Sequence, residues 1–336
     1  MTARTRLHEL VDAFPGRRIA VFGDLVLDRF ILGQPKRISR EAPVVILRFQ
    51  EQRDIPGGGA NAMANMASLG ATVLPLGVVG DDPEGRALLK ALADRGIQGP
   101  GLVTAQGFRT VTKVRILAGE PPSLRFQVAR YDLEDTLDED SPGTHEVLDR
   151  MVQVAATAQL AAVSDYGYGT VTPSSMALLR QALPSGALLV ADSRFALSQL
   201  GTVDAATPNL EELSRATETP LSGDEDVVAA AEALRRRMGA RFLVATRGSQ
   251  GLTLVPGDGA AVHIPVFGTD QVADVTGAGD TVLATLTLAL AAGASPLEAS
   301  HLANLAGGVV VMKAGTATVA PRELHRAIDL AEHLDV

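Results

Sequence analysis

Short apolar runs alternate with Ala/Leu-rich stretches of helical period along most of the chain. The runs predict strands over residues 18–22, 72–79, 160–163, 187–191, 203–206 and 242–245. Between them the pattern predicts helices, including those over 58–69, 83–95 and the apolar run 282–292. Strands that alternate with helices in this way form a mostly parallel sheet covered on both faces. The chain is therefore predicted to have an α/β fold.

Two segments, 34–50 and 109–130, depart from this alternation because they are strand-like and rich in basic residues. From 124 to 128 every other residue is apolar, as in a strand with one apolar face. A period of two also places these side chains on one face: Arg109, Val111, Lys113 and Arg115. We expect a small β-sheet lid formed by about 33–50 and 109–130. A solvated antiparallel extension is the alternative.

The stretch DVTGAGDT at 274–281 directly precedes the predicted helix over 282–292. The N–H groups of Gly277, Ala278 and Gly279 lack partners within a helix, and the helix dipole adds positive potential there. Such a turn can bind an anion. A carboxylate beside it, Asp280, can act as a general base. The plainer interpretation is that Asp274 or Thr276 caps a core helix.

Composition narrows the class of protein. The 336 residues are 46% hydrophobic and 21% charged, which suits a large folded core. A net charge of −9 argues against a general nucleic-acid or membrane-surface binder, and the lack of cysteine excludes thiolate metal sites. Residues 1–18 lack the apolar core of a signal peptide, and the apolar run 282–294 is too short to span a bilayer. We expect a cytoplasmic enzyme with neither nucleic-acid nor membrane partners.

PGGGAN at 56–61 and DVTGAGDT at 274–281 resemble the paired signatures of the PfkB, or ribokinase-like, sugar kinases. The resemblance runs from residue 19 to about 327. It implies one ribokinase-like kinase domain over 1–336, a three-layer α/β/α sandwich with a small β-sheet lid. Within the family the chain most resembles the kinase domain of heptose 7-phosphate kinases, on these passages: 23–29, 37–44, 164–166, 207–210 and 303–316. We expect the nucleotidyltransferase domain that follows the kinase in bifunctional members to be absent.

The resemblance also implies roles for individual residues and the use of ATP and Mg²⁺. Asp280 would deprotonate a sugar hydroxyl while Gly277, Ala278 and Gly279 hold the transferring phosphoryl group. Substrate contacts are expected from Asp28, Gly58, Gly59, Asn61, Lys113, Arg115, Asp165 and Arg194. Nucleotide contacts are expected from Asn209, Thr246, Gly248, Gly251 and Asn304. Asn209 and Glu212 match an N-x-x-E element that positions Mg²⁺ through water, although without the resemblance a helix start after Pro208 is the favoured interpretation of both residues. A monovalent cation such as K⁺ is implied near Asp274 and Thr276.

The sequence departs from heptose kinases at positions that bear on the substrate. Arg40 stands where those kinases usually have proline, and Asp192-Ser193-Arg194 stands in place of D-P-K-G. A lysine that they often carry near Tyr168 is also missing. We expect Arg194 to replace one missing lysine, because guanidinium binds phosphate with two hydrogen bonds. Basic residues gathered in an acidic protein favour a sugar phosphate: Lys36, Arg37, Arg40, Lys113, Arg115, Arg125 and Arg130.

Three alternatives remain open from the sequence. A kinase of a neutral sugar, of the ribokinase or fructokinase type, needs the same motifs without the phosphate contacts. Gly57-x-Gly59-x-x-Ala62 with Asp81 downstream fits a dinucleotide fingerprint and hence an oxidoreductase, but no strand runs straight into that turn. A sugar-binding regulator that has lost activity would not need Asp280. We also expect a homodimer formed through the lid, since a small sheet with an apolar face leaves its edges open.

Overall fold

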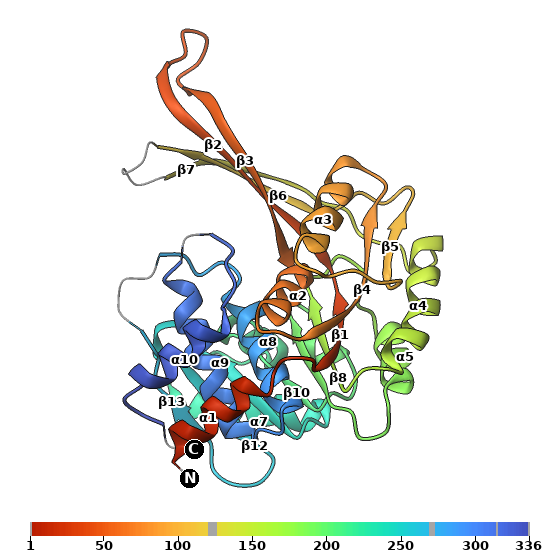
Figure 1. Ribbon diagram of the computed structural model, residues 1–336, viewed down its shortest axis with the longest axis vertical. Coiled ribbons are helices and arrows are strands. Elements are labelled where there is room, and N and C mark those ends of the chain that lie inside the picture. The colour runs from red at the N-terminus through yellow and green to blue at the C-terminus, as the bar shows by residue number, and fades with distance from the viewer. Residues whose placement is uncertain (1, 120–125, 269–272, 314, 335–336) are drawn as a thin grey trace.

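The computed structural model describes residues 2–119, 126–268, 273–313 and 315–334. The described chain forms one large sheet covered by helices and a smaller sheet that projects from one end (Figure 1). Both termini lie at the opposite end, where the first and last helices pack together.

The large sheet has nine strands among the described residues, and most neighbours run parallel. β11–β12 and β12–β13 are antiparallel, and the other pairs are parallel. The mostly parallel sheet predicted from the sequence is thereby confirmed, although β9 starts two residues later than expected and β10 is shorter. In spatial order the strands are β13 (Val262–Ile264), β12 (Leu252–Pro256), β11 (Phe242–Thr246), β10 (Ala205–Ala206), β9 (Leu189–Ser193), β8 (Leu160–Asp165), β1 (Arg18–Gly23), β4 (Thr72–Gly80) and β5 (Leu102–Ala105).

Helices connect these strands, and their starts are marked in the sequence. Five of those described begin with proline, whose fixed φ suits the first helical turn. The helices are α1 (Ala3–Asp12), α2 (Gly59–Ser68), α3 (Pro83–Ala93), α4 (Pro142–Ala155), α5 (Pro173–Ala182), α6 (Leu210–Thr217), α7 (Asp224–Met238), α8 (Ala278–Ala291), α9 (Pro296–Val311) and α10 (Pro321–Leu330). Short 3₁₀ turns lie at η1 (Leu197–Gln199) and η2 (Gly248–Gln250). None of the described helices is long and apolar enough to cross a membrane.

Strand β1 shows why the molecule has three layers. Ile19 and Val21 point to one face, where α1, α2, α3, α8, α9 and α10 contribute the core. Ala20 and Phe22 point to the other face, where α4, α5, α6 and α7 pack. The alternation of a strand with two buried faces thus divides the core into two layers.

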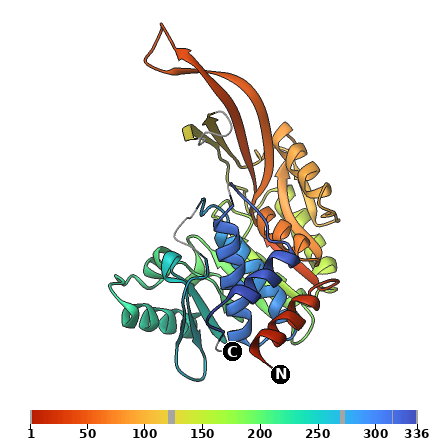
Figure 2. The same ribbon diagram turned by 60° about the vertical axis from the view of Figure 1, so that its left-hand side comes forward.

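The smaller sheet, which we call the lid sheet, contains β3 (Val45–Gly58), β2 (Leu25–Ile38), β6 (Thr112–Ala118) and β7 (Phe126–Leu133). Its β2–β3 hairpin stands away from the helices in both ribbon views (Figure 2). The strands run further than the predicted segments 34–50 and 109–130, and residues 120–125 lie outside the described residues. Because β2 pairs with β6 in parallel, the lid sheet is not the purely antiparallel extension considered above.

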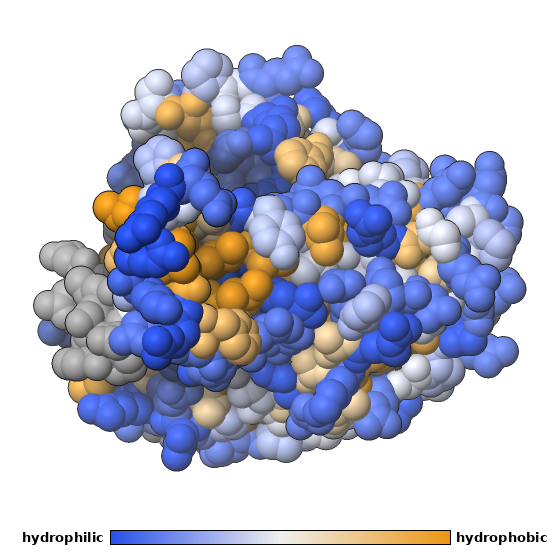
Figure 3. Space-filling view, turned by 90° about the horizontal axis from the view of Figure 1, so that it is seen from above, coloured by the Kyte–Doolittle hydropathy of each residue, from blue (hydrophilic) through white to orange (hydrophobic). Residues whose placement is uncertain are grey.

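Apolar surface collects on the lid sheet. Figure 3 views the molecule from the end at which the lid sheet projects. Apolar side chains gather there in a hollow among polar ones. Exposed large apolar residues of the lid sheet and its hairpin turn are Ile38, Val44, Val45, Phe49, Phe126, Val128 and Tyr131. Side chains of this kind on a projecting sheet are typical of an interface.

Candidate active site

Polar residues meet at the edge of the large sheet where the parallel strands end. Asp24 follows β1, Asp165 ends β8, Asp192 lies near the end of β9 and Thr246 ends β11. In α/β sheets this carboxyl edge is where ligands bind. The lid sheet leaves the large sheet at the same edge, because β2 begins one residue after Asp24.

Helix α8 begins at this edge with the turn that was predicted to bind an anion. Of its three amides, the Ala278 N–H is not free, contrary to the expectation, because it donates to the Val275 carbonyl at 3.2 Å. The N-cap of α8, Gly277, has φ of 80°, and a Cβ there would lie 2.5 Å from Nδ2 of Asn61. Glycine is therefore required at position 277, both for the left-handed backbone and for the close approach of α2. The first turn of α8 also carries Asp280, whose side chain is buried.

The Asp280 carboxylate is held by donors from α2, from β8 and from the loop that follows β8. Nδ2 of Asn61 donates to Oδ2 at 2.9 Å, and the Tyr166 hydroxyl lies 3.1 Å from Oδ1 and 3.2 Å from Oδ2. The Ser164 hydroxyl is a longer donor, 3.5 Å from Oδ1. Burial raises the pKa of Asp280 to about 7, against the lowering effect of the Asn61 and Tyr166 hydrogen bonds and of Lys113. A carboxylate with a pKa near neutrality is suited to general base catalysis.

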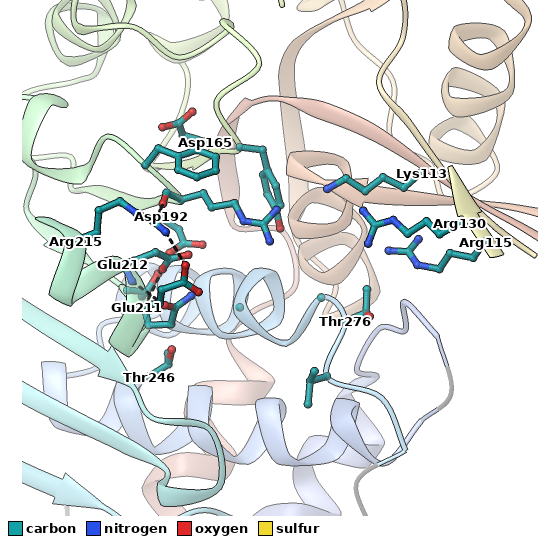
Figure 4. A pocket seen from close by; sticks show the side chains of 18 residues that line it. Lys113, Arg115, Arg130, Asp165, Asp192, Glu211, Glu212, Arg215, Thr246 and Thr276 are labelled. Carbon is teal, nitrogen blue, oxygen red and sulfur yellow. Dashed lines mark hydrogen bonds and ion pairs between the residues drawn. The ribbon is translucent and has the colours of Figure 1, made fainter. Parts of the chain in front are cut away.

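A cavity of about 530 Å³ opens between the lid sheet and the edge of the large sheet. Figure 4 shows Lys113, Arg115 and Arg130 reaching in from the lid sheet toward acidic side chains on the opposite wall. The acidic residues of the lining are Asp165, Asp192, Glu211 and Glu212. Burial first, then the neighbouring Glu212 and Asp280, raise the pKa of Asp192 well above its ordinary value. The cavity thus has a cationic wall and an acidic wall.

A smaller cavity of about 50 Å³ continues from it toward Asp280. Lys113, Arg115, Tyr166 and Gly277 line both cavities. Four predicted substrate residues line the smaller one together with the predicted base: Asp28, Gly58, Lys113 and Arg115. Residues from β2, β6 and α8, far apart in sequence, are thereby brought to one space.

The two lid cations differ in their partners. Nη1 of Arg115 lies 2.6 Å from Oδ1 of Asp28; the Asp28 side chain is buried and that of Arg115 is 11% exposed. The Thr316 hydroxyl donates to the other oxygen of Asp28 at 2.9 Å. Lys113 is 7% exposed and forms no ion pair with the described residues. Burial first, then the charge of Arg194, lower its pKa from the ordinary value.

An apolar cavity of about 200 Å³ lies on the other side of the α8 N-terminus. It brings together four of the predicted nucleotide residues: Thr246, Gly248, Gly251 and Asn304. Asn304 Nδ2 donates to the Pro265 carbonyl at 2.8 Å, so the amide is oriented by the protein. Thr246, Val275 and Gly279 line this cavity and the central one, and the three spaces therefore form one track.

Asn209 and Glu212 form a reciprocal capping box at the start of α6. Glu212 N–H donates to Asn209 Oδ1, and Asn209 N–H donates to Glu212 Oε2, each at 2.9 Å. The helix-start interpretation therefore holds, and both side chains also line the central cavity. Among the described residues no three His, Asp or Glu side chains are close enough to hold a metal ion by themselves. Burial raises the pKa of Glu212, against the lowering effect of its hydrogen bonds with Asn209 and of the charges of Arg194 and Arg215.

Several predicted site residues also make hydrogen bonds that stabilise the fold. Asn61 is buried between Asp280 and Asn65, to which its Oδ1 is hydrogen-bonded. Asp165 accepts from the Ser193 hydroxyl at 2.5 Å and from the Gly167 N–H at 2.9 Å, while Gly59 starts α2. Arg194 lines the central cavity from an exposed position. Asp274 accepts from Thr276 N–H at 2.9 Å and from Gly315 N–H at 3.2 Å, so it joins the two loops of the implied cation site.

The sequence did not single out two residues that the structure brings to the site. Tyr166 touches Asp280, and Asp192 lines the acidic wall. Arg130, which the sequence placed among the basic residues of the lid, lines the cationic wall. Asp192 directly follows the predicted strand over 187–191, so a signal for it was available. Tyr166 and Asp280 are 114 positions apart, and no local pattern connects them.

Comparisons with known proteins agree with this geometry. The family described as "pfkB family carbohydrate kinase" matches residues 17–323. The bifunctional protein HldE of Mesorhizobium japonicum is 38% identical over 326 residues, which cover 96% of this chain and 64% of that protein. The chain thus spans less than two thirds of the length of that relative.

Solved structures show the same fold. Phosphofructokinase-2 from Escherichia coli, in complex with potassium, superposes with a TM-score of 0.76 at 20% identity, covering 94% of this chain and 98% of that one. Arabidopsis thaliana ribokinase, complexed with ribose and ATP, gives a TM-score of 0.69 at 19% identity, covering 94% and 99%. The fold is ribokinase-like, which excludes the dinucleotide-binding alternative. Contrary to the expectation from the sequence, β3 runs straight into the glycines at 57–59, but it is a lid strand paired antiparallel with β2 and not a parallel strand of the large sheet. The chain therefore belongs to the pfkB family of carbohydrate kinases and is a phosphotransferase that acts on a sugar hydroxyl.

Proposed function

We propose that this kinase transfers the γ-phosphoryl group of ATP to a hydroxyl of a sugar phosphate, with heptose 7-phosphate as the first candidate. The observation that carries the proposal is Lys113. It is a buried cation that lines the cavity of the predicted base and forms no ion pair with a described residue. Aromatic rings of Tyr166 and Tyr168 lie near its ammonium group, but a buried cation without an anionic partner is costly, so such a site favours an anionic ligand.

The arrangement around Lys113 indicates where that anion would lie. Arg194 lines the central cavity beside it, whereas Arg115 is already paired with Asp28 and Arg130 with Asp132. The charge of Arg194 lowers the pKa of Lys113, and a bound phosphate would offset this repulsion. The sugar would then extend past Asp28 toward Asp280. Resemblance to heptose 7-phosphate kinases and similarity to HldE proteins support this substrate class.

The chemistry follows from the residues along the track. The Asp280 carboxylate would take the proton of the attacking hydroxyl, while the amides at the N-terminus of α8 hold the developing phosphoryl charge. The glycine-lined apolar cavity would take the nucleotide base, with Asn304 as a directional contact. Asn209 and Glu212 would hold Mg²⁺ through water. When bound, Mg²⁺ neutralises phosphate charge during transfer. Use of ATP agrees with a cytoplasmic enzyme.

A neutral-sugar kinase is the second candidate, and the Asp28–Arg115 ion pair favours it. Arg115 needs no phosphate, and Asp28 is already placed to contact sugar hydroxyls. The two candidates are separated by a kinase assay that compares sugar phosphates with the corresponding free sugars. The assay contains Mg·ATP and measures the release of ADP. We expect turnover with phosphorylated sugars. Equal or better turnover with free sugars would refute the sugar-phosphate assignment.

We further propose that the chain acts as one kinase domain over 1–336 and pairs as a homodimer through the lid sheet. The exposed apolar side chains on β3 and β7, such as Phe49 and Phe126, support this pairing. A second copy would cover them and close over the sugar site. Asp274 and Thr276 remain the proposed place for a monovalent cation, in line with the potassium complex of phosphofructokinase-2.

A further inference from the structure

We propose that Tyr166 is a positioning residue for phosphoryl transfer, orienting the Asp280 carboxylate through its hydroxyl and the substrate-facing cations through its ring. This inference rests on the proposed function, in which Asp280 is the base. Tyr166 lies in one of the passages that carry the family resemblance, 164–166, but the resemblance implied no role for it.

The hydroxyl of Tyr166 is aimed at the middle of the carboxylate. It lies 3.1 Å from Oδ1 and 3.2 Å from Oδ2 of Asp280, and Asn61 donates to Oδ2 from the opposite element. Ser164 Oγ is a third, longer donor, 3.5 Å from Oδ1. An ionised carboxylate accepts about four hydrogen bonds, so Tyr166 and Asn61 fix its plane and capacity remains toward the sugar cavity. Burial and the Asp280 charge raise the pKa of Tyr166 well above its ordinary value, which keeps the hydroxyl a donor.

A buried carboxylate holds the loop that carries this hydroxyl. Asp24 accepts hydrogen bonds from the backbone N–H groups of Tyr166, Tyr168 and Thr170, at 2.8, 3.0 and 3.1 Å. Its side chain is 1% exposed. Three charge-assisted hydrogen bonds from one short loop give that loop a single conformation. The position of the Tyr166 hydroxyl is therefore built into the fold and does not depend on a bound sugar.

The ring of Tyr166 lies near two cations that line the substrate cavity. Nζ of Lys113 lies 5.2 Å from the ring centroid, and Cζ of Arg194 lies 5.9 Å from it. Both separations fall within the range of cation–π attraction. One side chain thus contacts the base with its hydroxyl and two cations with its ring. Loss of the hydroxyl and loss of the ring should therefore have different consequences.

Other charged groups also act on the pKa of Asp280, so a variant that tests Tyr166 must leave those residues unchanged. Asp28 on β2 raises its pKa, Lys113 on β6 lowers it, and Asp192 on β9 faces it across the cavity. Tyr166→Phe leaves all three in place and removes one donor. Tyr168→Phe is the matched control, because its hydroxyl bonds Glu134 at 2.7 Å instead of Asp280.

The test is the pH dependence of kcat from pH 5.5 to 9 with saturating Mg·ATP and the best sugar found in the screen. In the wild type, kcat should fall on the acid side of the profile with a midpoint near pH 7, as the raised pKa of Asp280 requires. We call this fall the acid limb of the profile. Loss of one hydrogen bond to the carboxylate should move the limb of Tyr166→Phe up by about one pH unit, so kcat at pH 6 falls about tenfold. Tyr168→Phe should leave the limb unchanged.

A second variant separates the ring from the hydroxyl. Tyr166→Phe keeps the ring, so the KM for sugar should change little, whereas Tyr166→Leu should raise that KM as well. Circular dichroism verifies that each variant is folded. An unmoved limb in Tyr166→Phe, or an equal fall in kcat at every pH, would overturn the inference. Asp280→Asn that keeps its activity would instead refute the proposed base, whatever Tyr166 does.

Discussion

Replacement of Lys113 by methionine tests the substrate site and has opposite expected effects on activity and stability. Methionine has a similar length and no charge, so the variant keeps most of the packing of a side chain that is 7% exposed. If Lys113 binds the substrate phosphate, the variant loses one charge-assisted hydrogen bond. That costs ~1.5–3 kcal/mol, or about ten- to a hundredfold in kcat/KM for the sugar phosphate.

The free enzyme should gain stability from the same change. Burial lowers the pKa of Lys113, so between the folded pKa and 10.5 the unfolded chain binds more protons and wild-type stability rises with pH. Removing the buried charge should raise the Tm by about 1–3 °C at neutral pH. This advantage should shrink as the pH approaches 10.5.

The assay is ADP release with varied sugar and with varied ATP, alongside thermal unfolding without ligands. Lys36→Met is the matched control, because Lys36 lies exposed on β2 of the same sheet. The ATP KM and the activity on unphosphorylated sugar should change little in either variant. An equal loss of kcat/KM for phosphorylated and free sugars would refute the role of Lys113, and so would a matching rise in the ATP KM.

Three further predictions concern other parts of the molecule. Phe49→Asp on the exposed lid sheet should convert the dimer to a monomer in light scattering; a wild type that is fully active as a monomer would refute the pairing. Gly251→Ala should raise the ATP KM at least several-fold, since φ is 84° there and a Cβ would overlap the Ile264 carbonyl; an unchanged KM would exclude this turn from the nucleotide site. Because the folded pKa of Asp280 is about 7, its contribution to stability is complete below pH 4 and is lost as pH rises through 7. The free energy of unfolding of Asp280→Asn, measured by denaturation, should not show that loss as the pH rises. A pH profile identical to that of the wild type would contradict the raised pKa.

The layers of the fold could be predicted from the sequence because they depend on local periodicity. Ile19 to Phe22 form a continuous apolar run, which suits a strand buried on both faces, and β1 has this environment. The ends of the strands were harder to predict from the sequence. The strand predicted over 203–206, for example, contributes only Ala205 and Ala206 to the sheet as β10. The lid sheet was recognised from its alternation, but its parallel β2–β6 pairing joins segments about 85 residues apart and leaves no local signal.

The site was predictable only in part, for the same reason. Gly277 and Asp280 lie within one motif, so their proximity could be inferred. Lys113 and Arg115 share a strand face, and periodicity could not tell them apart. The structure does, because Asp28 pairs with Arg115 and leaves Lys113 without an ion pair among the described residues. That distinction depends on the register of β2 against β6, which only tertiary structure sets.

Turnover of Asp280→Asn tests the central claim most directly. Asparagine has the same shape but cannot accept the proton, and a general base contributes ~10²–10⁴-fold. With Mg·ATP and the best sugar phosphate, kcat measured by ADP release should fall by about that factor. ATP affinity measured by calorimetry should stay nearly unchanged. A variant that keeps more than about a tenth of wild-type turnover would contradict the assignment of Asp280 as the base.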